Sequence, residues 1–212
     1  PTPSSAASDV YKRQIVIEAI AFGWLWIFVN LLSAVLAASA CLFYVFVYSL
    51  WLKRSSTSNI VIGGAAGAVP VLIGWSSVTN SIDWPPIILF LIIFLWTPPH
   101  FWALAIRYKD DYSNAEVPML PVIEGTKVTG YRMVLYAFQV WAASLIFVPV
   151  ADMGVVYLIT AIVMGAIFTL FSFQVMINPT KKSAMRLFGF SISYITILFS
   201  LMAVDQLVRS GF

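Results

Sequence analysis

The sequence predicts an all-α fold, a polytopic membrane helical bundle of about seven transmembrane helices. Of the 212 residues, 61% are hydrophobic and only 10% are charged, whereas a soluble domain carries about 25% charged residues. The apolar residues also form runs long enough to cross a bilayer, which takes about 20 residues. Because backbone polar groups in lipid must be paired within the segment, these runs predict helices rather than strands. The composition excludes a water-soluble globule, a disordered chain and a nucleic-acid-binding protein.

The first apolar run covers residues 15–52 and contains one charged residue, Glu18. As a single helix it would measure about 57 Å, far more than the hydrocarbon core of about 30 Å. We therefore expect two helices that turn near residues 30–33. The other predicted spans are 58–78, 85–108, 131–150, 155–177 and 187–207.

Residues 1–14 are polar and rich in serine and alanine, and the composition changes abruptly at Ile15. The segment does not show the order of charged, apolar and small residues that a secretory signal has. We interpret residues 1–14 as a non-native leader and residues 15–212 as the transmembrane domain. We therefore expect the chain to begin in mid-protein.

The charges of the connections alternate along the chain. Nine of the 12 basic residues fall in connections that the predicted helices bring to one side, whereas Asp83 and Asp152 lie in the opposite connections. By the positive-inside rule the basic side faces the cytoplasm. We expect a multi-pass protein of the bacterial-type inner (plasma) membrane, with these nine residues cytoplasmic: Lys53, Arg54, Arg107, Lys109, Lys127, Arg132, Lys181, Lys182 and Arg186.

The longest connection, residues 107–132, contains the apolar, proline-stiffened segment 118–122. Long loops in compact proteins are usually functional or disordered. We expect an ordered lid or short helix against the membrane face, and the alternative is a simple linker.

His100 is the single histidine and follows Pro98 and Pro99 within the fourth span. Prolines inside a helix free carbonyl groups one turn earlier, and an ionisable residue in a span is a candidate functional group. If the helix continues, His100 shares one face with Arg107 and Asp111. The alternative is a structural histidine bonded to a neighbouring helix. One histidine excludes a multi-histidine metal site within this chain.

Asp110 and Asp111 lie at the predicted cytoplasmic end of the same span. Paired carboxylates suit Mg²⁺, which binds one or two carboxylates together with substrate phosphates. The alternative is a solvated acidic turn.

Lys53 and Arg54 follow the second span, on the same predicted side and among hydroxyl-bearing residues. Arginine offers a planar fork and lysine a point charge, so the pair can hold a diphosphate. The alternative is ordinary anchoring by positive charge.

The third span opens with small residues, including Gly63 and Gly67 at the spacing that lets two helix backbones approach closely. The same small side chains could instead leave room for a bulky planar or isoprenoid ligand.

These segments resemble the UbiA-type intramembrane prenyltransferases, and within them the branch of the protohaem IX farnesyltransferases (haem O synthases). The resemblance runs from about residue 24 to residue 207, through the segments 48–54, 59–68, 73–75, 94–106, 110–112, 117–122 and 186–191. Segment 118–121 and one longer string are specific to the haem branch: Trp96, Thr97, Pro98, Pro99, His100 and Phe101.

The resemblance implies a bundle of nine transmembrane helices around a cavity open to the lipid, of which this chain would contain the C-terminal seven. It implies transfer of the farnesyl group of farnesyl diphosphate to a vinyl group of haem B, with hydroxyl addition. The product, haem O, serves haem-copper oxidase biogenesis. The implied cofactor is Mg²⁺, haem B being a substrate. The other implied partners are the lipid bilayer and a haem A synthase or oxidase-assembly protein.

The resemblance also implies roles for particular residues. His100, Asp110 and Asp111 would be catalytic, and the two aspartates would hold Mg²⁺ through the diphosphate. Diphosphate-binding residues would be Lys53, Arg54, Asn59 and Tyr48.

The sequence departs from the family in one important place, because the family's first acidic motif has no counterpart here. We therefore expect that the chain by itself is inactive. Val71 replaces a usual second proline, and Glu116 stands where a small residue is expected. Two other functions remain open: a prenyltransferase for a quinone-ring or chlorin acceptor, and a non-enzymatic membrane transporter, since broken helices and intramembrane ionisable groups also mark substrate paths.

Overall fold

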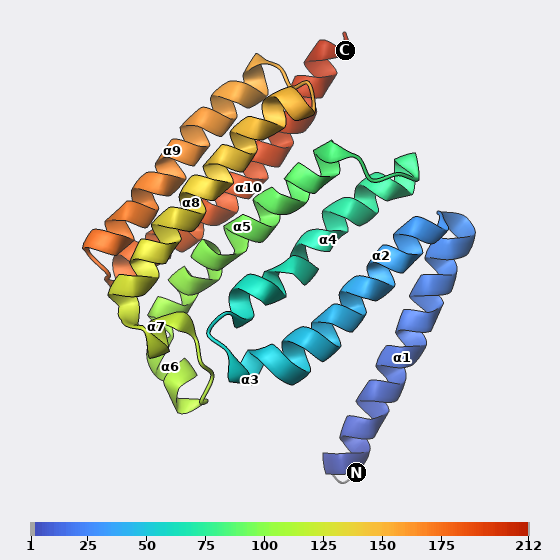
Figure 1. Cartoon of the computed structure of the whole chain (residues 1–212), viewed down its shortest axis with the longest axis horizontal. Coiled ribbons are helices and arrows are strands. Elements are labelled where there is room, and N and C mark those ends of the chain that lie inside the picture. Colours follow the sequence, from blue (N-terminus) through green and yellow to red (C-terminus); the bar gives the residue numbers. More distant parts are fainter. Residues whose placement is uncertain (1–2, 212) are drawn as a thin grey trace.

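Every secondary-structure element is a helix in the part of the chain that the computed structural model describes, which is residues 3–211, with side chains from Lys12 onward. The long helices run alternately in opposite directions (Figure 1), which confirms the predicted all-α membrane bundle. The elements are α1 (Pro3–Phe28), α2 (Leu31–Leu42), the π-helical η1 (Phe43–Leu52), α3 (Lys53–Ser55), α4 (Asn59–Thr79), α5 (Trp84–Arg107), α6 (Lys109–Asn114), α7 (Leu120–Ile123), α8 (Gly125–Val150), α9 (Val155–Ile177) and α10 (Lys181–Arg209).

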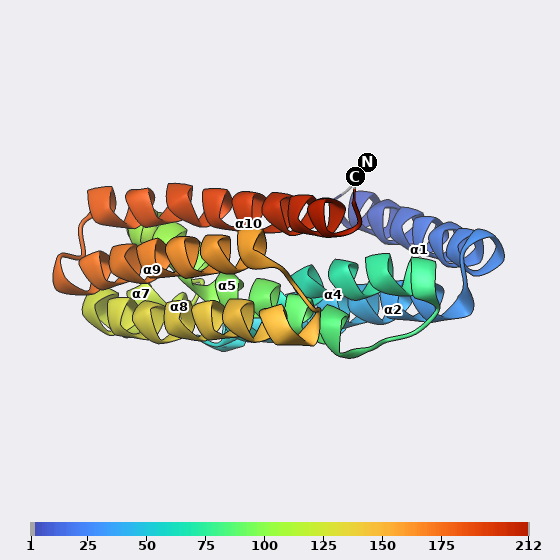
Figure 2. The ribbon, with the colours of Figure 1, turned by 90° about the horizontal axis from the view of Figure 1, so that it is seen from above.

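Helix α5 is the centre of the bundle, because it packs against α4, α8 and α10. Helix α9 packs against α8 and α10, while α2 and then α1 follow α4 outward on the other side. Figure 2 shows α10 and α8 on opposite sides of this group. The large, fully buried side chains are concentrated in the half formed by α5, α8, α9 and α10, where Trp102, Tyr157, Phe168 and Tyr194 are less than 2% exposed.

Six helical segments between residues 3 and 211 are long and apolar enough to cross a membrane. Helices α2, η1 and α3 together form the first of them, Leu31–Ser55. The remaining predicted span, which begins at residue 15 and is the first along the chain, forms the second half of α1. It does not meet the criterion of length and hydropathy for crossing a membrane. The residues expected as a leader continue into this helix from Pro3 onward, and residues 1 and 2 lie outside the described residues.

The turn expected near residues 30–33 lies at residues 29 and 30, where Asn30 caps α2. Its side-chain oxygen accepts a hydrogen bond from Ser33 N at 2.8 Å, and its Nδ2 donates to Ser76 O of α4 at 2.7 Å. The hydroxyls of Ser33 and Ser76 are 2.8 Å apart in the buried interface. The turn therefore ends α1 and also fixes α2 against α4.

Two helices begin several residues before the apolar runs that predict them. Helix α10 starts at Lys181 because Thr180 caps it, accepting from Ser183 N at 3.1 Å in a reciprocal capping box. Helix α8 starts at Gly125, and Arg132 pairs with Glu124 at 2.7 Å across its first turns. Polar first turns extend both helices beyond their membrane-spanning part.

The connection between α5 and α8 is an ordered segment, as predicted. It contains the short helices α6 and α7. Met119 and Leu120 are buried, and α7 packs against α5 and α8. The segment therefore covers one end of the bundle.

A buried carboxylate holds the opposite end together. Asp205 of α10 is 2% exposed and accepts hydrogen bonds from the backbone N–H groups of Gly154 and Tyr157 at the start of α9. These N–H groups have no partner within their own helix, and a carboxylate there is further stabilised by the helix dipole. Asp205 therefore ties α9 to α10.

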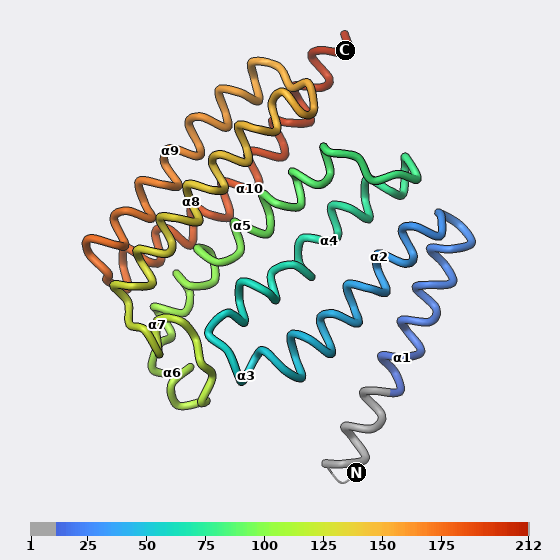
Figure 3. The backbone as a smooth tube through the Cα atoms, in the orientation of Figure 1, coloured from blue at the N-terminus to red at the C-terminus, as the bar shows by residue number. Residues whose placement is uncertain are grey.

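The chain path groups the connections as the charge pattern predicts. The tube in Figure 3 shows α3, α6 and the start of α10 at one end of the bundle, and the α4–α5 and α8–α9 connections at the other. Lys53, Arg54, Lys109, Lys181 and Lys182 lie in or at the start of elements at the first end. We call it the basic end.

Candidate functional site

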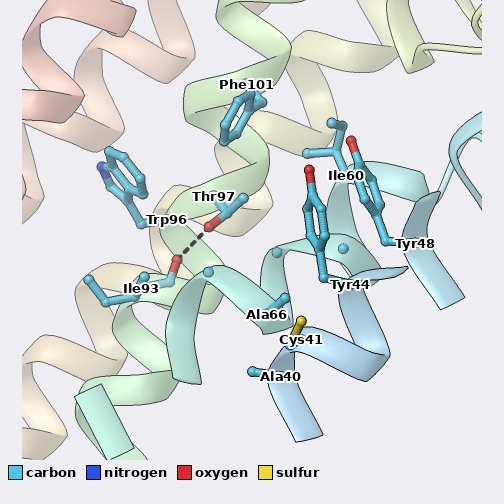
Figure 4. Close-up of a pocket in the computed structure, with 13 residues that line it drawn as sticks. Ala40, Cys41, Tyr44, Tyr48, Ile60, Ala66, Ile93, Trp96, Thr97 and Phe101 are labelled. Carbon is cyan, nitrogen blue, oxygen red and sulfur yellow. Dashed lines mark hydrogen bonds between the residues drawn. The ribbon is translucent and has the colours of Figure 1, made fainter. Parts of the chain in front are cut away.

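An apolar cavity of about 610 Å³ lies between the α2–η1 segment, α4 and α5. Figure 4 shows the rings of Tyr44 and Tyr48 along one wall and Trp96, Thr97 and Phe101 along another. The lining extends from the middle of these helices, at Ala40 and Ile93, toward the basic end, where it includes Tyr48 five residues before α3 and Ile60 at the start of α4. The volume is within the range of about 300–1,000 Å³ found for small-molecule sites.

Small residues of α4 both pack the helices and shape this cavity. A methyl group added at Gly63 would overlap the Tyr48 ring, and one at Gly64 would lie 2.9 Å from Thr97 Cγ2. A methyl group at Gly67 would meet nothing within 4 Å, although Gly67 also lines the cavity. The two interpretations of this segment therefore apply to different glycines: Gly63 and Gly64 serve close packing, and Gly67 leaves open space.

Of the predicted diphosphate-binding residues, Tyr48 lines the cavity, where its ring centroid lies 5.3 Å from that of Tyr44. Asn59 is 1% exposed, and its Nδ2 lies 3.3 Å from the backbone oxygen of Lys53. Its Oδ1 is buried with no hydrogen-bond partner in the described part of the chain. Asn59 thus holds the α3 turn in place and keeps one unsatisfied acceptor.

Lys53 and Arg54 form the exposed α3 turn. Arg54 lines a hollow of about 280 Å³ together with Tyr112 and Ser113 of α6, Glu116 and other residues between α6 and the end of α7. Lys53 does not line this hollow or the apolar cavity. The structure therefore brings Arg54, but not the Lys53 side chain, against the segment that follows the two aspartates.

Asp110 and Asp111 lie in the first turn of α6 at the same basic end. They line a second hollow, of about 390 Å³, with Arg107, Tyr108 and Lys181. Lys181 Nζ is 3.7 Å from Asp110 Oδ2, and both side chains are mostly exposed. The hollow therefore combines two acidic and two basic side chains, a mixture that suits an anion bound through a cation.

The expected continuous face from His100 to Asp111 is absent, because α5 ends at Arg107. Tyr108 interrupts the helix with φ −101° and ψ 28°, and the aspartates begin the separate helix α6. The spacing argument required an unbroken helix, so it is wrong for Asp111. What α5 does provide is a fixed position for the start of α6.

His100 is 9% exposed and lies next to the cavity without lining it. The side chains of Trp96 and Phe101 separate the two, since both line the cavity and both contact the imidazole, at centroid distances of 4.3 and 5.1 Å. His100 Nδ1 is 2.6 Å from Ser191 Oγ of α10. The histidine is thus bonded to a neighbouring helix, as its structural interpretation predicts, and also lies one side chain away from the cavity.

Sequence reasoning did not identify Lys181 or Ser191 as site residues. The positive charge of Lys181 is already accounted for by the positive-inside rule, so it did not indicate a site. Ser191 is one of many serines in apolar helices. The contacts that distinguish them join residues 71 and 91 positions apart. No local pattern in the sequence marks such pairs.

The donor set at the basic end has two carboxylates. No cluster of three or more metal-ligating histidine, cysteine, aspartate or glutamate side chains occurs within the described residues. Two carboxylates alone do not make a metal cage, but they fit a cation that completes its coordination with substrate phosphates.

Comparison with known proteins identifies the family. The UbiA prenyltransferase family matches residues 10–197. The protoheme IX farnesyltransferase of Parafrankia sp. (strain EAN1pec) is 50% identical over 196 residues, which is 91% of this chain and 62% of that protein. The protein of the same name from Clavibacter michiganensis subsp. michiganensis is 48% identical over 198 residues, with 91% and 64% covered. The one from Frankia casuarinae is 50% identical over 196 residues, with 91% and 67% covered.

The chain thus spans a little under two thirds of the length of the first two relatives. A solved structure, described as giving insights into the biosynthesis of digeranylgeranylglyceryl phosphate synthase in membranes, has a TM-score of 0.76 and 19% identity, and covers 93% of this chain and 69% of that one. At that identity the likeness shows a shared fold. With its six apolar spans, the chain is a multi-pass integral membrane protein that belongs to the UbiA prenyltransferase family.

Proposed function

We propose that this chain is part of an enzyme that transfers the farnesyl group of farnesyl diphosphate to a vinyl group of haem B, giving haem O. The observation that carries the proposal is an apolar cavity that extends toward the basic end, where one hollow brings Arg107 and Lys181 together with Asp110 and Asp111 and another contains Arg54. An isoprenoid diphosphate has the same two parts, an apolar chain and a charged head. The identity to protoheme IX farnesyltransferases supports farnesyl and haem B as the substrates.

The charged head would be bound by residues of the basic end. Asp110 and Asp111 would hold Mg²⁺ together with the diphosphate, and Arg54, Arg107 and Lys181 would donate charge-assisted hydrogen bonds. When bound, Mg²⁺ supplies Lewis-acid neutralisation of the diphosphate oxygens. Lys53 adds positive charge from the surface, where screening weakens it.

The apolar lining would hold the farnesyl chain and exclude water. As the allylic C–O bond breaks, its electron pair leaves with the diphosphate, and donors already in place at the basic end stabilise that charge. The π electrons of the haem vinyl group form the new C–C bond. Water then adds to the remaining cationic carbon and loses a proton, which completes the hydroxyethyl group. The rings of Tyr44, Tyr48 and Phe101 would protect the first cation from premature capture.

The proposal is tested by expressing the chain alone and joined to the N-terminal region of the Parafrankia relative. Membranes receive farnesyl diphosphate and haem B, and haem O is measured by chromatography and mass spectrometry. We expect product from the joined protein and none from the chain alone. The double variant Asp110→Asn with Asp111→Asn should lose at least about a hundredfold in rate.

Asp83→Asn is the matched control, because Asp83 is an exposed aspartate at the opposite end of α5. Full activity of the double variant would refute the role of the aspartates. Prenylation of a quinone-ring or chlorin acceptor in place of haem B would refute the acceptor. Substrate flux in liposomes without prenyl transfer would indicate a transporter.

We also propose that the protein resides in the bacterial inner membrane with its basic end in the cytoplasm, as the positive-inside rule predicts. Cys41→Ala removes the single cysteine of the sequence. In that background, Lys182→Cys introduces an exposed thiol, which should react with a membrane-impermeant thiol reagent only after the inner membrane is opened. Labelling of intact cells would reverse this orientation. A haem A synthase or oxidase-assembly partner is compatible with the product and is testable by co-purification.

A further inference from the structure

The imidazole of His100 is enclosed on both its faces and at one edge. The indole of Trp96 and the ring of Phe188 each stack on it, with centroids at 4.3 and 4.5 Å and interplanar angles of 19° and 23°. Phe101 meets it edge-on. Because the faces are covered, another molecule can reach the ring only at an edge, in the plane of its nitrogen lone pair.

Ser191 determines which nitrogen carries the proton. Its Oγ lies 2.6 Å from His100 Nδ1 and also 2.6 Å from the backbone oxygen of Phe188. A serine hydroxyl has one hydrogen, and a carbonyl oxygen can only accept. Both short contacts are hydrogen bonds only if the hydroxyl donates to Phe188 O and Nδ1–H donates to Ser191 Oγ. The geometry therefore selects the tautomer in which Nδ1 is protonated and Nε2 carries the lone pair.

Ser191 is itself held in place by the same cluster. Trp96 Nε1 donates to the backbone oxygen of Ser191 at 2.8 Å, and Ser191 is fully buried. Trp96 thus stacks on the histidine and also anchors the residue that orients it. Helices α5 and α10 are joined at this point by two hydrogen bonds and one aromatic stack.

The Nε2 edge remains available. Nε2 makes no hydrogen bond to the described part of the chain, and the residue retains 9% exposure. A neutral imidazole nitrogen with a free lone pair accepts a proton or a hydrogen bond. So small an exposed area admits a donor the size of water more readily than the face of a porphyrin. Because Trp96 and Phe101 separate His100 from the cavity, Nε2 reaches a group in the cavity through a bridging water molecule.

We infer that Ser191 is a positioning residue that holds His100 as the Nδ1–H tautomer, so that Nε2 accepts, through one bridging water, the proton of the water that hydroxylates the prenylated haem. This inference rests on the proposed function. In the step, a lone pair of the water oxygen forms the C–O bond to the cationic carbon, and one O–H bond breaks. The bridging water takes this proton and gives one of its own to the Nε2 lone pair, and the resulting imidazolium keeps its Nδ1–H bond to Ser191. No oxidant or reductant is needed.

The single histidine makes the tautomer directly measurable. In protein labelled with ¹⁵N-histidine and purified in detergent, His100 should give a protonated resonance for Nδ1 and an unprotonated one for Nε2. Ser191→Ala should replace this pattern with a mixture of tautomers, and Ser191→Thr, which keeps the hydroxyl, should restore it. The control is Ser172→Ala on α9, because Ser172 is equally buried and its hydroxyl bonds only Phe168 O of its own helix. It should leave the spectrum unchanged.

Activity of the joined protein then tests the role of Nε2. Ser191→Ala should slow haem O formation by about fivefold to tenfold, the effect of one lost hydrogen bond, and His100→Ala by at least about a hundredfold, as for a lost general base. A protonated Nε2 in the unmodified protein, or an unchanged tautomer in Ser191→Ala, would overturn the inference, whether or not haem O is formed. A His100-dependent shift of the haem absorption band would assign the lone pair to iron and overturn the role in water addition.

Discussion

Replacing Gly63 and Gly67 by alanine, one at a time, tests whether the α4 contacts shape the cavity. Both glycines lie in the same helix and line the same cavity. Each replacement gains roughly 0.5–1 kcal/mol because alanine loses less backbone entropy in a helix. A Cβ at residue 67 meets nothing within 4 Å, whereas one at residue 63 would lie 2.7 Å from Tyr48 Cε2 and closer still to Cδ2. Only the second variant must therefore displace a ring.

The expected effect is the difference in the free energy of unfolding between the two variants. The gain from replacing a helical glycine by alanine is the same in both and cancels in this difference. What remains is the overpacking at Gly63, which costs about 1–3 kcal/mol. We expect Gly67→Ala to raise the free energy of unfolding slightly. The free energy of unfolding of Gly63→Ala should be about 1–3 kcal/mol lower than that of Gly67→Ala. Tyr48 is displaced in Gly63→Ala, so the cavity changes shape and the KM for farnesyl diphosphate should rise.

The assay is equilibrium unfolding of the purified protein in mixed detergent micelles, followed by circular dichroism. Adding Tyr48→Ala to each variant supplies the control, because removing the ring should abolish the difference between alanine at 63 and alanine at 67. Equal stability of the two single variants would show that the Tyr48 ring is not packed on Gly63. A difference that persists without the ring would refute the same reasoning.

Three further predictions concern the two ends of the bundle. Asp205→Ala should lower the free energy of unfolding by about 1–3 kcal/mol, since two backbone N–H groups lose their acceptor. Asp152→Ala is the control and should change this free energy little, because that carboxylate is 92% exposed in its ion pair. Equilibrium unfolding in detergent measures both variants. Arg54→Ala in the joined protein should raise the KM for farnesyl diphosphate about tenfold through a lost charge-assisted bond, and Lys127→Ala, an exposed lysine of the first turn of α8, should not. Deletion of residues 1–14 should leave the unfolding midpoint unchanged, and a loss of folded protein would disprove the interpretation of this segment as a leader.

The spans were predictable because hydropathy is a local property of the chain. Residues 155–177 were predicted as a span and form α9 with the same bounds. The ends of other helices were not predictable from hydropathy, since polar turns such as the Thr180 capping box extend α10 beyond the apolar run. The span expected from residue 15 illustrates the same limit, because its helix α1 extends back over a polar segment.

The positions of the candidate site residues were only partly predictable. Charge alternation placed Arg54 on one side, the predicted end of the fourth span placed Asp110 and Asp111 there too, and the chain path brings them to one end of the bundle. The face from His100 to Asp111 was wrong because a single residue, Tyr108, leaves the helical conformation. One interrupted turn changes the direction of every later side chain, and spacing alone does not reveal it.

By itself, the sequence determined that this protein is a helical membrane bundle and which of its segments carry charge, because both follow from the cost of placing polar groups in lipid. Only the tertiary structure decided that Ser191 meets His100, that Lys181 meets Asp110 and that Gly63 packs against the Tyr48 ring whereas Gly67 faces open space. These pairs come from helices distant in the chain. Their meeting depends on packing, which is a property of all the helices together.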